Sequence, residues 1–226
     1  MQPRTNGRSI LVVDHPALQD RLAQLRDRNT PTRSFRVLLE HVGALLAYEA
    51  TRSLPTREVD VETPLLSMKA ARIAQPPVIA PILRAGLGLV PGFLQIVEDA
   101  VVAHLGFYRD PQTLQAVPYY ANIPARLDGR RVFVLDPMLA TGASGIAALR
   151  LLATHGASEV TFVSVIAAPE GIAAIQAAFP DVRIVVGAVD AELNEHGYIV
   201  PGLGDAGDRL FGSLTSLPTF VAPRSL

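Results

Sequence analysis

The stretch Val132-Phe133-Val134-Leu135-Asp136-Pro137-Met138-Leu139-Ala140-Thr141-Gly142-Ala143-Ser144 decides the fold of this chain. It begins with an apolar run that is typical of a buried strand and that ends in an acid, Asp136. A loop of small residues follows and leads into an apolar helix. The first backbone N–H groups of a helix have no partner inside it, so a strand, a tight loop and a helix N-terminus form an anion site. Because the acid can accept from sugar hydroxyls, the stretch predicts a site for phosphate beside ribose.

From Pro77 onward the chain repeats this pattern of apolar strand, loop and helix. Mostly continuous apolar runs, as expected of parallel strands buried on both faces, span 78–83, 101–107, 132–136, 160–167 and 182–189. Helices are expected at 92–97, 144–155 and 170–179. The alternation predicts an α/β fold with a doubly wound, mostly parallel sheet flanked by helices, with ligands bound outside the carboxyl ends of its strands.

Other segments do not follow this pattern. The N-terminal segment is predicted to be helical, with a first helix within 14–29 and a second that Thr32 can cap. Residues 57–63 alternate like a half-exposed strand, whereas 64–77 show no clear periodicity. Residues 108–124 are too long and too rich in turn formers for a simple connection, so we expect a hairpin-like excursion that covers a site.

The composition is that of a globular protein. The 226 residues are 49% hydrophobic and 18% charged, which suits a sizeable core, and we expect 1–226 to form a single domain. A net charge of −1 provides no general attraction to nucleic acid. The absence of cysteine fits a reducing compartment, and no apolar run approaches the roughly 18 residues of a membrane span. Residues 1–9 lack the apolar core of a signal peptide, so we expect a cytoplasmic protein without nucleic-acid or membrane partners.

The loop at 136–144 has a structural interpretation as well as a functional one. Asp136 could cap the loop, and Thr141 and Ser144 could cap the helix, because many α/β proteins have such a loop without phosphate. In favour of phosphate, Thr141 and Gly142 bring a hydroxyl together with bare backbone. The pattern alone supports the two interpretations about equally.

Arginines stand at the ends of two predicted strands. Arg84 precedes two glycines that allow close backbone approach, and Arg109 follows the strand 101–107. An unpaired buried guanidinium would be costly, so each has a partner, either a structural carboxylate or a ligand. Two arginines beside a phosphate-type loop predict a clamp for a second, more highly charged anion.

The segment 194–212 is rich in glycine and aspartate. It is either an irregular surface loop whose glycines serve turns or a backbone-lined pocket for a planar polar ligand. In the second case, backbone groups of Ile199, Gly204 and Ala206 could read the edge of a ring. His196 is a general-base candidate, but a lone histidine beside Glu195 is more often structural.

Together these motifs resemble the uracil phosphoribosyltransferase family. The resemblance covers about residues 14–213 and is carried by TPTRSFRVLLEHVGALLAYEAT (30–51), ILRAGLG (82–88), YRD (108–110), AVPYY (116–120), DPMLATGAS (136–144), AAPEGI (167–172) and NEHGYIVPGLGDAGDRLFG (194–212). It implies that uracil attacks the anomeric carbon of 5-phosphoribosyl 1-diphosphate (PRPP), giving UMP and diphosphate. The cofactor would be Mg2+ and the role pyrimidine salvage.

The resemblance also implies a role for each matching residue. Asp136 would hold the ribose hydroxyls and Arg84 and Arg109 the diphosphate; with Asp205 they are the expected catalytic residues. The expected PRPP site is Arg84, Arg109, Asp136, Pro137, Met138, Leu139, Ala140, Thr141, Gly142, Ala143, Ser144 and Asp205. The expected uracil site is Ile199, Gly204, Asp205 and Ala206. No residue is assigned as a metal ligand, because Mg2+ is expected to be held mainly by the diphosphate of PRPP.

Two positions depart from the family pattern. Ala143 replaces a usual second glycine, at a cost of roughly 1 kcal/mol if the residue needs a positive φ and none if it is helical. Pro91 replaces a common aspartate and is predicted to begin a helix. The tail 214–226 has no assignment.

Two other functions remain open: a non-catalytic pyrimidine-nucleotide sensor that binds RNA on the same fold, and a degenerate paralogue that binds nucleotide without turnover. The resemblance further implies a homo-oligomer, a dimer or larger, and a possible GTP effector that would make the enzyme allosteric.

Overall fold

The structure, a computed structural model, describes residues 10–109 and 116–212. Its main sheet contains β1 (Ile10–Val12), β4 (Val78–Leu83), β5 (Val101–Val102), β6 (His104–Arg109), β7 (Ala116–Asn122), β8 (Arg131–Leu135), β9 (Met138–Leu139), β10 (Glu159–Ala167) and β11 (Arg183–Val189). The strand order is β1-β11-β10-β8-β4-β6-β7, with β5 beside β4 and β9 beside β10. The pairings within this sheet are parallel except for β6 with β7.

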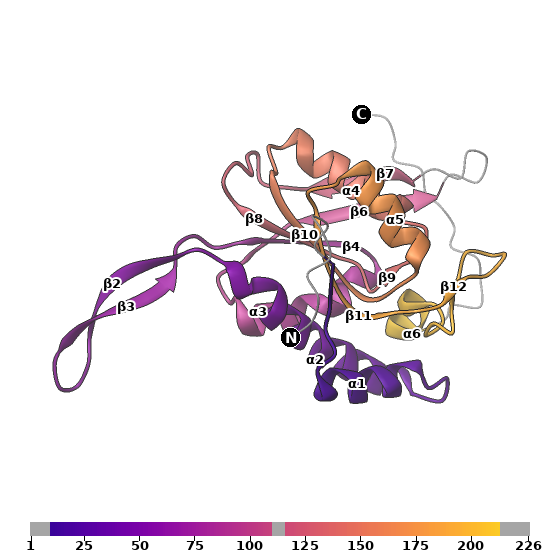
Figure 1. The fold of residues 1–226 in the computed structure, drawn as a ribbon, viewed down its shortest axis with the longest axis horizontal. Coiled ribbons are helices and arrows are strands. Elements are labelled where there is room, and N and C mark those ends of the chain that lie inside the picture. Colours follow the sequence, from indigo (N-terminus) through magenta and orange to yellow (C-terminus); the bar gives the residue numbers. More distant parts are fainter. Residues whose placement is uncertain (1–9, 110–115, 213–226) are drawn as a thin grey trace.

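Helices lie against both faces of this sheet (Figure 1). The helices are α1 (Pro16–Arg26), α2 (Thr32–Ala50), α3 (Val90–Ile96), α4 (Ala143–Thr154), α5 (Pro169–Ala178) and the short α6 (Ala206–Phe211). Successive strand side chains point to opposite faces. Accordingly, Phe133 and Leu135 of β8 join the core under α1 and α2, whereas Val132 and Val134 join the core under α4 and α5. The predicted doubly wound, mostly parallel sheet is confirmed.

The strand order reverses between β8 and β4. From β8 the chain runs through α4 to β10 and through α5 to β11, moving outward in one direction. From β4 it moves outward to β6 in the other direction. In open α/β sheets, ligands bind outside the carboxyl ends of the strands at this switch point. A ligand site is therefore expected at the residues that follow β4 and β8.

Several predicted boundaries need correction. Thr32 does not cap α2, because Pro31 occupies the N-cap position and Thr32 is the first helical residue. The run 101–107 is two strands with Ala103 between them, although the Ala103 N–H still donates to the Ile79 carbonyl at 2.8 Å. Pro91 does lie in the first turn of α3, as predicted. The other helices and strands that were predicted begin and end within a few residues of their expected positions, and β1, β9, β12, β13 and α6 had not been predicted.

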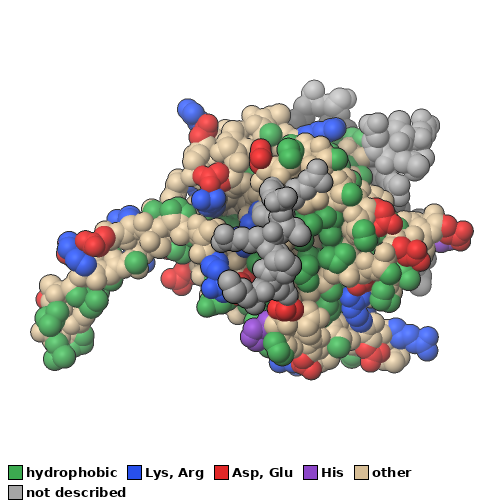
Figure 2. All heavy atoms as spheres, in the orientation of Figure 1, with side chains coloured by type: hydrophobic (Ala, Val, Ile, Leu, Met, Phe, Trp, Pro, Cys, Tyr) green, Lys and Arg blue, Asp and Glu red, His purple; other side chains and the backbone are tan. Residues whose placement is uncertain are grey.

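The segment left without an assignment, 64–77, contains a strand. β3 (Ser67–Ile73) pairs antiparallel with β2 (Thr56–Glu62), and the two form an arm that projects from the body (Figure 1). Both faces of the arm are mostly exposed, so its sequence lacks the apolar side of a core strand. Its outer end carries hydrophobic side chains (Figure 2), with Leu65 93% and Leu66 62% exposed.

The excursion at 108–124 is partly described. β7 pairs antiparallel with β6, which confirms a hairpin, and its tip at 110–115, including Asp110, lies outside the described residues. The expectations for residues 1–9 and 214–226 also fall outside them. Among the described residues, no helix has the length and apolar character needed to cross a membrane.

Candidate active site

The loop after β8 is held on the neighbouring strand β10. The Leu139 N–H donates to the buried Ser164 hydroxyl at 3.1 Å, and the Pro137 carbonyl accepts from the N–H groups of Val165 and Ile166, each at 3.1 Å. Residues 138 and 139 then pair with β10 as β9. These bonds position the loop firmly at the carboxyl edge of the sheet.

The rest of the loop leads into the N-terminus of α4. Gly142 is the N-cap residue of α4 and has a φ of +82°, a conformation that favours glycine. A glycine has no side chain with which to cap the helix. The Ala143 N–H meets the Thr141 hydroxyl at 3.4 Å. A cavity of about 80 Å³, lined by Asp136 and residues 138–145, lies against this helix end. It has the size and the backbone donors for one small oxyanion.

Ala143 is the first residue of α4. The departure from a second glycine is therefore harmless to the backbone, since an alanine in a helix has an ordinary φ. Gly142, and not Thr141 or Ser144, occupies the N-cap position of α4. The Thr141 hydroxyl nevertheless accepts from the N–H of the first helical residue, and Thr141 and Ser144 both line the cavity.

Asp136 is the first residue after β8 and lines the same cavity. Its Oδ1 accepts from the Met138 N–H at 3.3 Å. Burial raises the pKa of this carboxyl to about 7, and the hydrogen bond from Met138 offsets only part of that effect. The carboxylate thus lacks the hydrogen bonds that would stabilise its charge, and hydroxyl donors from a ligand would supply them.

Arg84 is the first residue after β4, beside Asp136 in the topology. It is 60% exposed, so the expected cost of a buried guanidinium does not arise. Its partners are on α6: the Arg84 Nη2 lies 4.0 Å from Asp208 Oδ1, and its guanidinium lies 5.8 Å from the centroid of the Phe211 ring. A Cβ at Gly86 would lie 2.4 Å from the Leu135 carbonyl oxygen, so glycine permits this loop to pack against the end of β8.

The segment 194–212 extends from a small hairpin to α6. The hairpin pairs β12 (Glu192–Leu193) with β13 (Ile199–Val200), and the side chain of Asn194 accepts from the His196 and Tyr198 N–H groups. A Cβ at Gly197 would lie 3.9 Å from Thr141 Cγ2, so the hairpin turn stands next to the phosphate-type loop. At the base of the hairpin, Glu170 of α5 accepts from the Leu193 N–H at 3.3 Å.

Of the predicted base-reading residues, Ile199 lies in β13, and the other three lie at the far end of this segment. Gly204 has a φ of +78°, and Asp205 is the N-cap of α6, its Oδ1 accepting from the Asp208 N–H at 2.9 Å. Ala206 is the first residue of that helix and is buried, as is Ile199.

The named contacts close a ring around the carboxyl ends of β4 and β8. Gly86 brings the Arg84 loop to Leu135, the cavity joins Asp136 to α4, and Gly197 brings the hairpin to Thr141. Asp208 and Phe211 then connect α6 back to Arg84. The structure thus brings together the predicted phosphate, ribose and base segments.

Arg109 is the last residue of β6, which lies beside β4, but its side chain is outside the described structure. His196 forms an exposed ion pair with Glu195, with 3.3 Å between Nε2 and Oε1. In the described part of the chain, no group of three or more His, Cys, Asp or Glu is placed to hold a metal ion.

The residues that hold this site from below were not predicted from the sequence. Arg26 of α1 pairs with Asp190, and Arg209 donates to the carbonyls of Leu25, Asp27 and Leu203. Asp190 follows a predicted strand just as Asp136 does, and that position was the signal available for it. No local pattern identifies Arg26, because its partner is 164 residues away.

A phosphate-type loop, an acid and an arginine at the switch point of a doubly wound sheet define a nucleotide-binding α/β enzyme of the phosphoribosyltransferase class. The model of the family described as uracil phosphoribosyltransferase matches residues 12–213. The chain belongs to this family.

Curated relatives and a solved structure are similar to this chain over most of its length. Uracil phosphoribosyltransferase of Anoxybacillus flavithermus is 52% identical over 90% of this chain and 98% of its own length. The Staphylococcus aureus uracil phosphoribosyltransferase is 52% identical over 89% of this chain and 97% of its own. The structure of the AQ2163 protein from Aquifex aeolicus has a TM-score of 0.87 and 39% identity, covering 92% of this chain and 100% of that chain.

Proposed function

We propose that this chain transfers the 5-phosphoribosyl group from PRPP to N1 of uracil, giving UMP and diphosphate in pyrimidine salvage. The relatives that cover most of the chain bear the name of this activity. The observation that carries the proposal is the placement of Arg84 and Asp136 directly after adjacent parallel strands, near the N-terminus of α4. A phosphorylated sugar fits between them.

The donor's ribose phosphate binds at the loop after β8. The 5′-phosphate accepts from backbone N–H groups of residues 140–144 and from the hydroxyls of Thr141 and Ser144, at the positive end of α4. The position of the loop is fixed by the hydrogen bonds that join Pro137, Met138 and Leu139 to β10. The Asp136 carboxylate accepts from the ribose hydroxyls. These donors replace the water that burial removed, so binding lowers the pKa of Asp136.

The diphosphate binds toward Arg84 and Arg109. Arg84 exchanges its long contact with Asp208 for the more highly charged diphosphate, and Arg109, the last residue of β6, is the proposed second cation. Asp205 lies at the N-terminus of α6, the helix that also contacts Arg84, where it faces the sugar-diphosphate. Fixed cations stabilise the charge that grows on the leaving group.

The residues also fit Mg2+, which proteins often bind through one or two carboxylates and the phosphates of a substrate. Asp205 supplies an exposed carboxylate of this kind, and the diphosphate supplies the other oxygens. When bound, Mg2+ would neutralise part of the charge on the departing diphosphate.

Uracil binds to the backbone of Ile199, Gly204, Asp205 and Ala206. Backbone groups that pair with its carbonyls make the N1 proton easier to lose, so a side-chain base such as His196 is not required. Cytosine presents an amine where uracil presents a carbonyl. A backbone donor facing that amine would be left unpaired, at a cost of about 1–3 kcal/mol.

The arm of β2 and β3 supports a homo-oligomer, a dimer or larger. A two-stranded ribbon is marginally stable alone, and its apolar outer end is almost fully exposed at Leu65. We assign that end to a contact with a second copy.

We further propose one phosphoribosyltransferase domain over 1–226, allosteric activation by GTP, and a cytoplasmic location, where phosphorylated donors that cannot cross membranes are made. Fractionation of cells tests the location.

The deciding experiment incubates the pure protein with Mg2+, PRPP and labelled uracil, with labelled cytosine as the matched control and each reaction run with and without GTP. UMP from uracil alone supports the reaction and the base site, and a faster rate with GTP supports the effector. Nucleotide binding without product under both conditions would reject the enzyme. Retention of RNA at moderate salt would then favour the sensor.

A further inference from the structure

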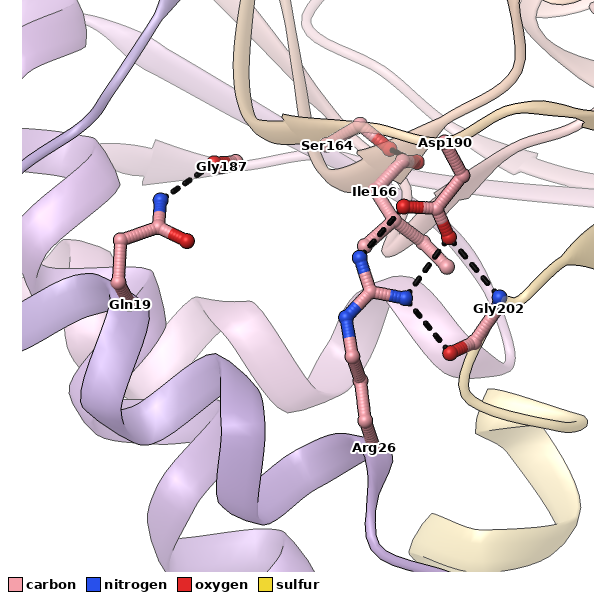
Figure 3. Close-up of polar contacts among 7 residues, drawn as sticks. All are labelled: Gln19, Arg26, Ser164, Ile166, Gly187, Asp190 and Gly202. Carbon is pink, nitrogen blue, oxygen red and sulfur yellow. Dashed lines mark hydrogen bonds and ion pairs between the residues drawn. The ribbon is translucent and has the colours of Figure 1, made fainter.

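A largely buried ion pair holds Gly202 of the base loop, residues 199–204, from below (Figure 3). Arg26 Nη1 and Nη2 donate to the two carboxylate oxygens of Asp190 at 2.7 and 2.5 Å. The Gly202 N–H donates to Asp190 Oδ2 at 2.9 Å, and the Gly202 carbonyl accepts from Arg26 Nη1 at 2.7 Å. The backbone N–H of Gly202 therefore bonds to Asp190, and its carbonyl bonds to Arg26.

Gly202 in turn fixes Ile199. A Cβ at Gly202 would lie 2.1 Å from the Ile199 carbonyl oxygen, so the turn between them is closed. On the other side, Arg209 donates to the Leu203 carbonyl at 2.8 Å, and Gly204 follows. A shift of the Gly202 backbone is therefore expected to move the residues on both of its sides, Ile199 and Gly204.

The pair is built for precise geometry. The Asp190 side chain is only 5% exposed and that of Arg26 is 24% exposed. A bidentate guanidinium–carboxylate pair adds directional specificity to its charge. A buried ion pair contributes little net stability relative to an apolar pair of the same volume. Stability alone therefore explains this arrangement poorly, whereas alignment of the base loop explains each of its four bonds.

We propose that Arg26 and Asp190 are positioning residues for the nucleobase. They hold the backbone of 199–204 in the conformation that binds uracil, and neither touches the substrates. This inference rests on the proposed base site at Ile199, Gly204, Asp205 and Ala206. It assigns to the end of α1 a role in base affinity and in the choice of uracil over cytosine.

Steady-state kinetics of two conservative variants test the proposal. Asp190→Asn is isosteric but turns an amide N–H toward one of the groups that donate to Asp190. Arg26→Lys keeps the positive charge but loses the two parallel N–H donors of the guanidinium. Each is expected to raise the KM for uracil by about 10- to 100-fold while the KM for PRPP stays within about twofold, because small misplacements of a binding group have effects of this size. The preference for uracil over cytosine falls as well. Circular dichroism and Tm establish that each variant is folded.

Gln19→Ala is the matched control. Gln19 also lies on α1, and its side-chain amide donates to the Val13 and Gly187 carbonyls at 3.1 and 2.9 Å. Figure 3 shows it apart from Asp190 and Gly202. Its removal loosens the same helix and is expected to lower Tm without changing either KM. Gly204→Ala probes the base site itself, since its φ of +78° disfavours a side chain.

The outcomes separate the two proposals. If Gly204→Ala raises the uracil KM but the two ion-pair variants leave it unchanged, the base site stands and the positioning role is overturned. If the ion-pair variants raise the KM values for uracil and PRPP together, or only lower Tm as Gln19→Ala does, the pair serves only stability. The inference is then likewise overturned. If Gly204→Ala has no effect on uracil, the proposed base site fails, and this inference fails with it.

Discussion

Arg84 and Asp136 each occupy the first position after one of two adjacent parallel strands, β4 and β8, which are in register at Pro81 and Leu135. A cation and an acid therefore follow neighbouring strands where the strand order reverses, with Arg84 two residues farther along than the position level with Asp136. The guanidinium is exposed and the carboxyl is desolvated. One is suited to a diphosphate and the other to hydroxyl donors, which are the two parts of the proposed donor.

Removal of the Arg84 guanidinium should affect the donor and not the base. Arg84→Ala is expected to lower kcat/KM for PRPP by about 10²- to 10³-fold, because a fixed group that stabilises developing charge is lost. The KM for uracil should change little. Initial rates at varied PRPP and saturating uracil measure this. Arg150→Ala on the exposed side of α4 is the control, and equal losses in both variants would remove Arg84 from the site.

The raised pKa of Asp136 should make the free protein less stable at higher pH. The folded state holds this proton more tightly, with a pKa of about 7 against an ordinary 3.8. The free energy of unfolding therefore falls as pH rises between these values and remains lower above them. Asp136→Asn should be more stable than wild type by about 2–4 kcal/mol at pH 8 and nearly equal at about pH 4. Urea unfolding at both pH values measures this, and an unchanged difference between them would contradict it.

Ala143 and Gly142 should respond oppositely to small changes. Ala143→Gly should leave UMP formation within about twofold and cost about 0.5–1 kcal/mol of stability, because the residue is helical. Gly142→Ala places a side chain at a φ of +82° and should cost about 1–2 kcal/mol as well as donor affinity. Thermal unfolding and PRPP titration compare the two. A gain in activity from Ala143→Gly would show that this alanine impairs the loop.

The exposed end of the arm should set the oligomeric state. The double variant Leu65→Asp/Leu66→Asp places charges at the apolar tip and should shift the protein to a smaller species in sedimentation velocity. Leu65→Met/Leu66→Met, which keeps the apolar surface, is the control. An identical mass for wild type and the aspartate variant would exclude the tip from the interface.

The parallel core was predictable because its signals are local. Runs such as 132–136 and 182–189 are apolar on both faces, which few structures other than a buried parallel strand require. The loop residues that follow them were found for the same reason. By contrast, β3 was missed because the arm buries almost nothing, and the single strand expected at 101–107 is interrupted at Ala103.

The parts of the site that escaped prediction depend on distant partners. Arg26 and Asp190 meet only after α1 has packed on the sheet, and neither lies in a local pattern that indicates the other. Arg84 was expected to need a partner because it follows a buried strand, yet the structure places its guanidinium in solvent beside α6. The three-dimensional path of the chain, rather than its composition, determines both features.

The pH dependence of kcat/KM for PRPP, measured as UMP formed from uracil by wild type and Asp136→Asn, tests the central claim most directly. The wild-type value should rise through about pH 7 as Asp136 ionises, since this parameter reports the free enzyme. The variant should be at least about 100-fold less active at pH 8, and its kcat/KM should not rise through about pH 7. A variant with wild-type activity and an unchanged profile would show that Asp136 does not hold the donor.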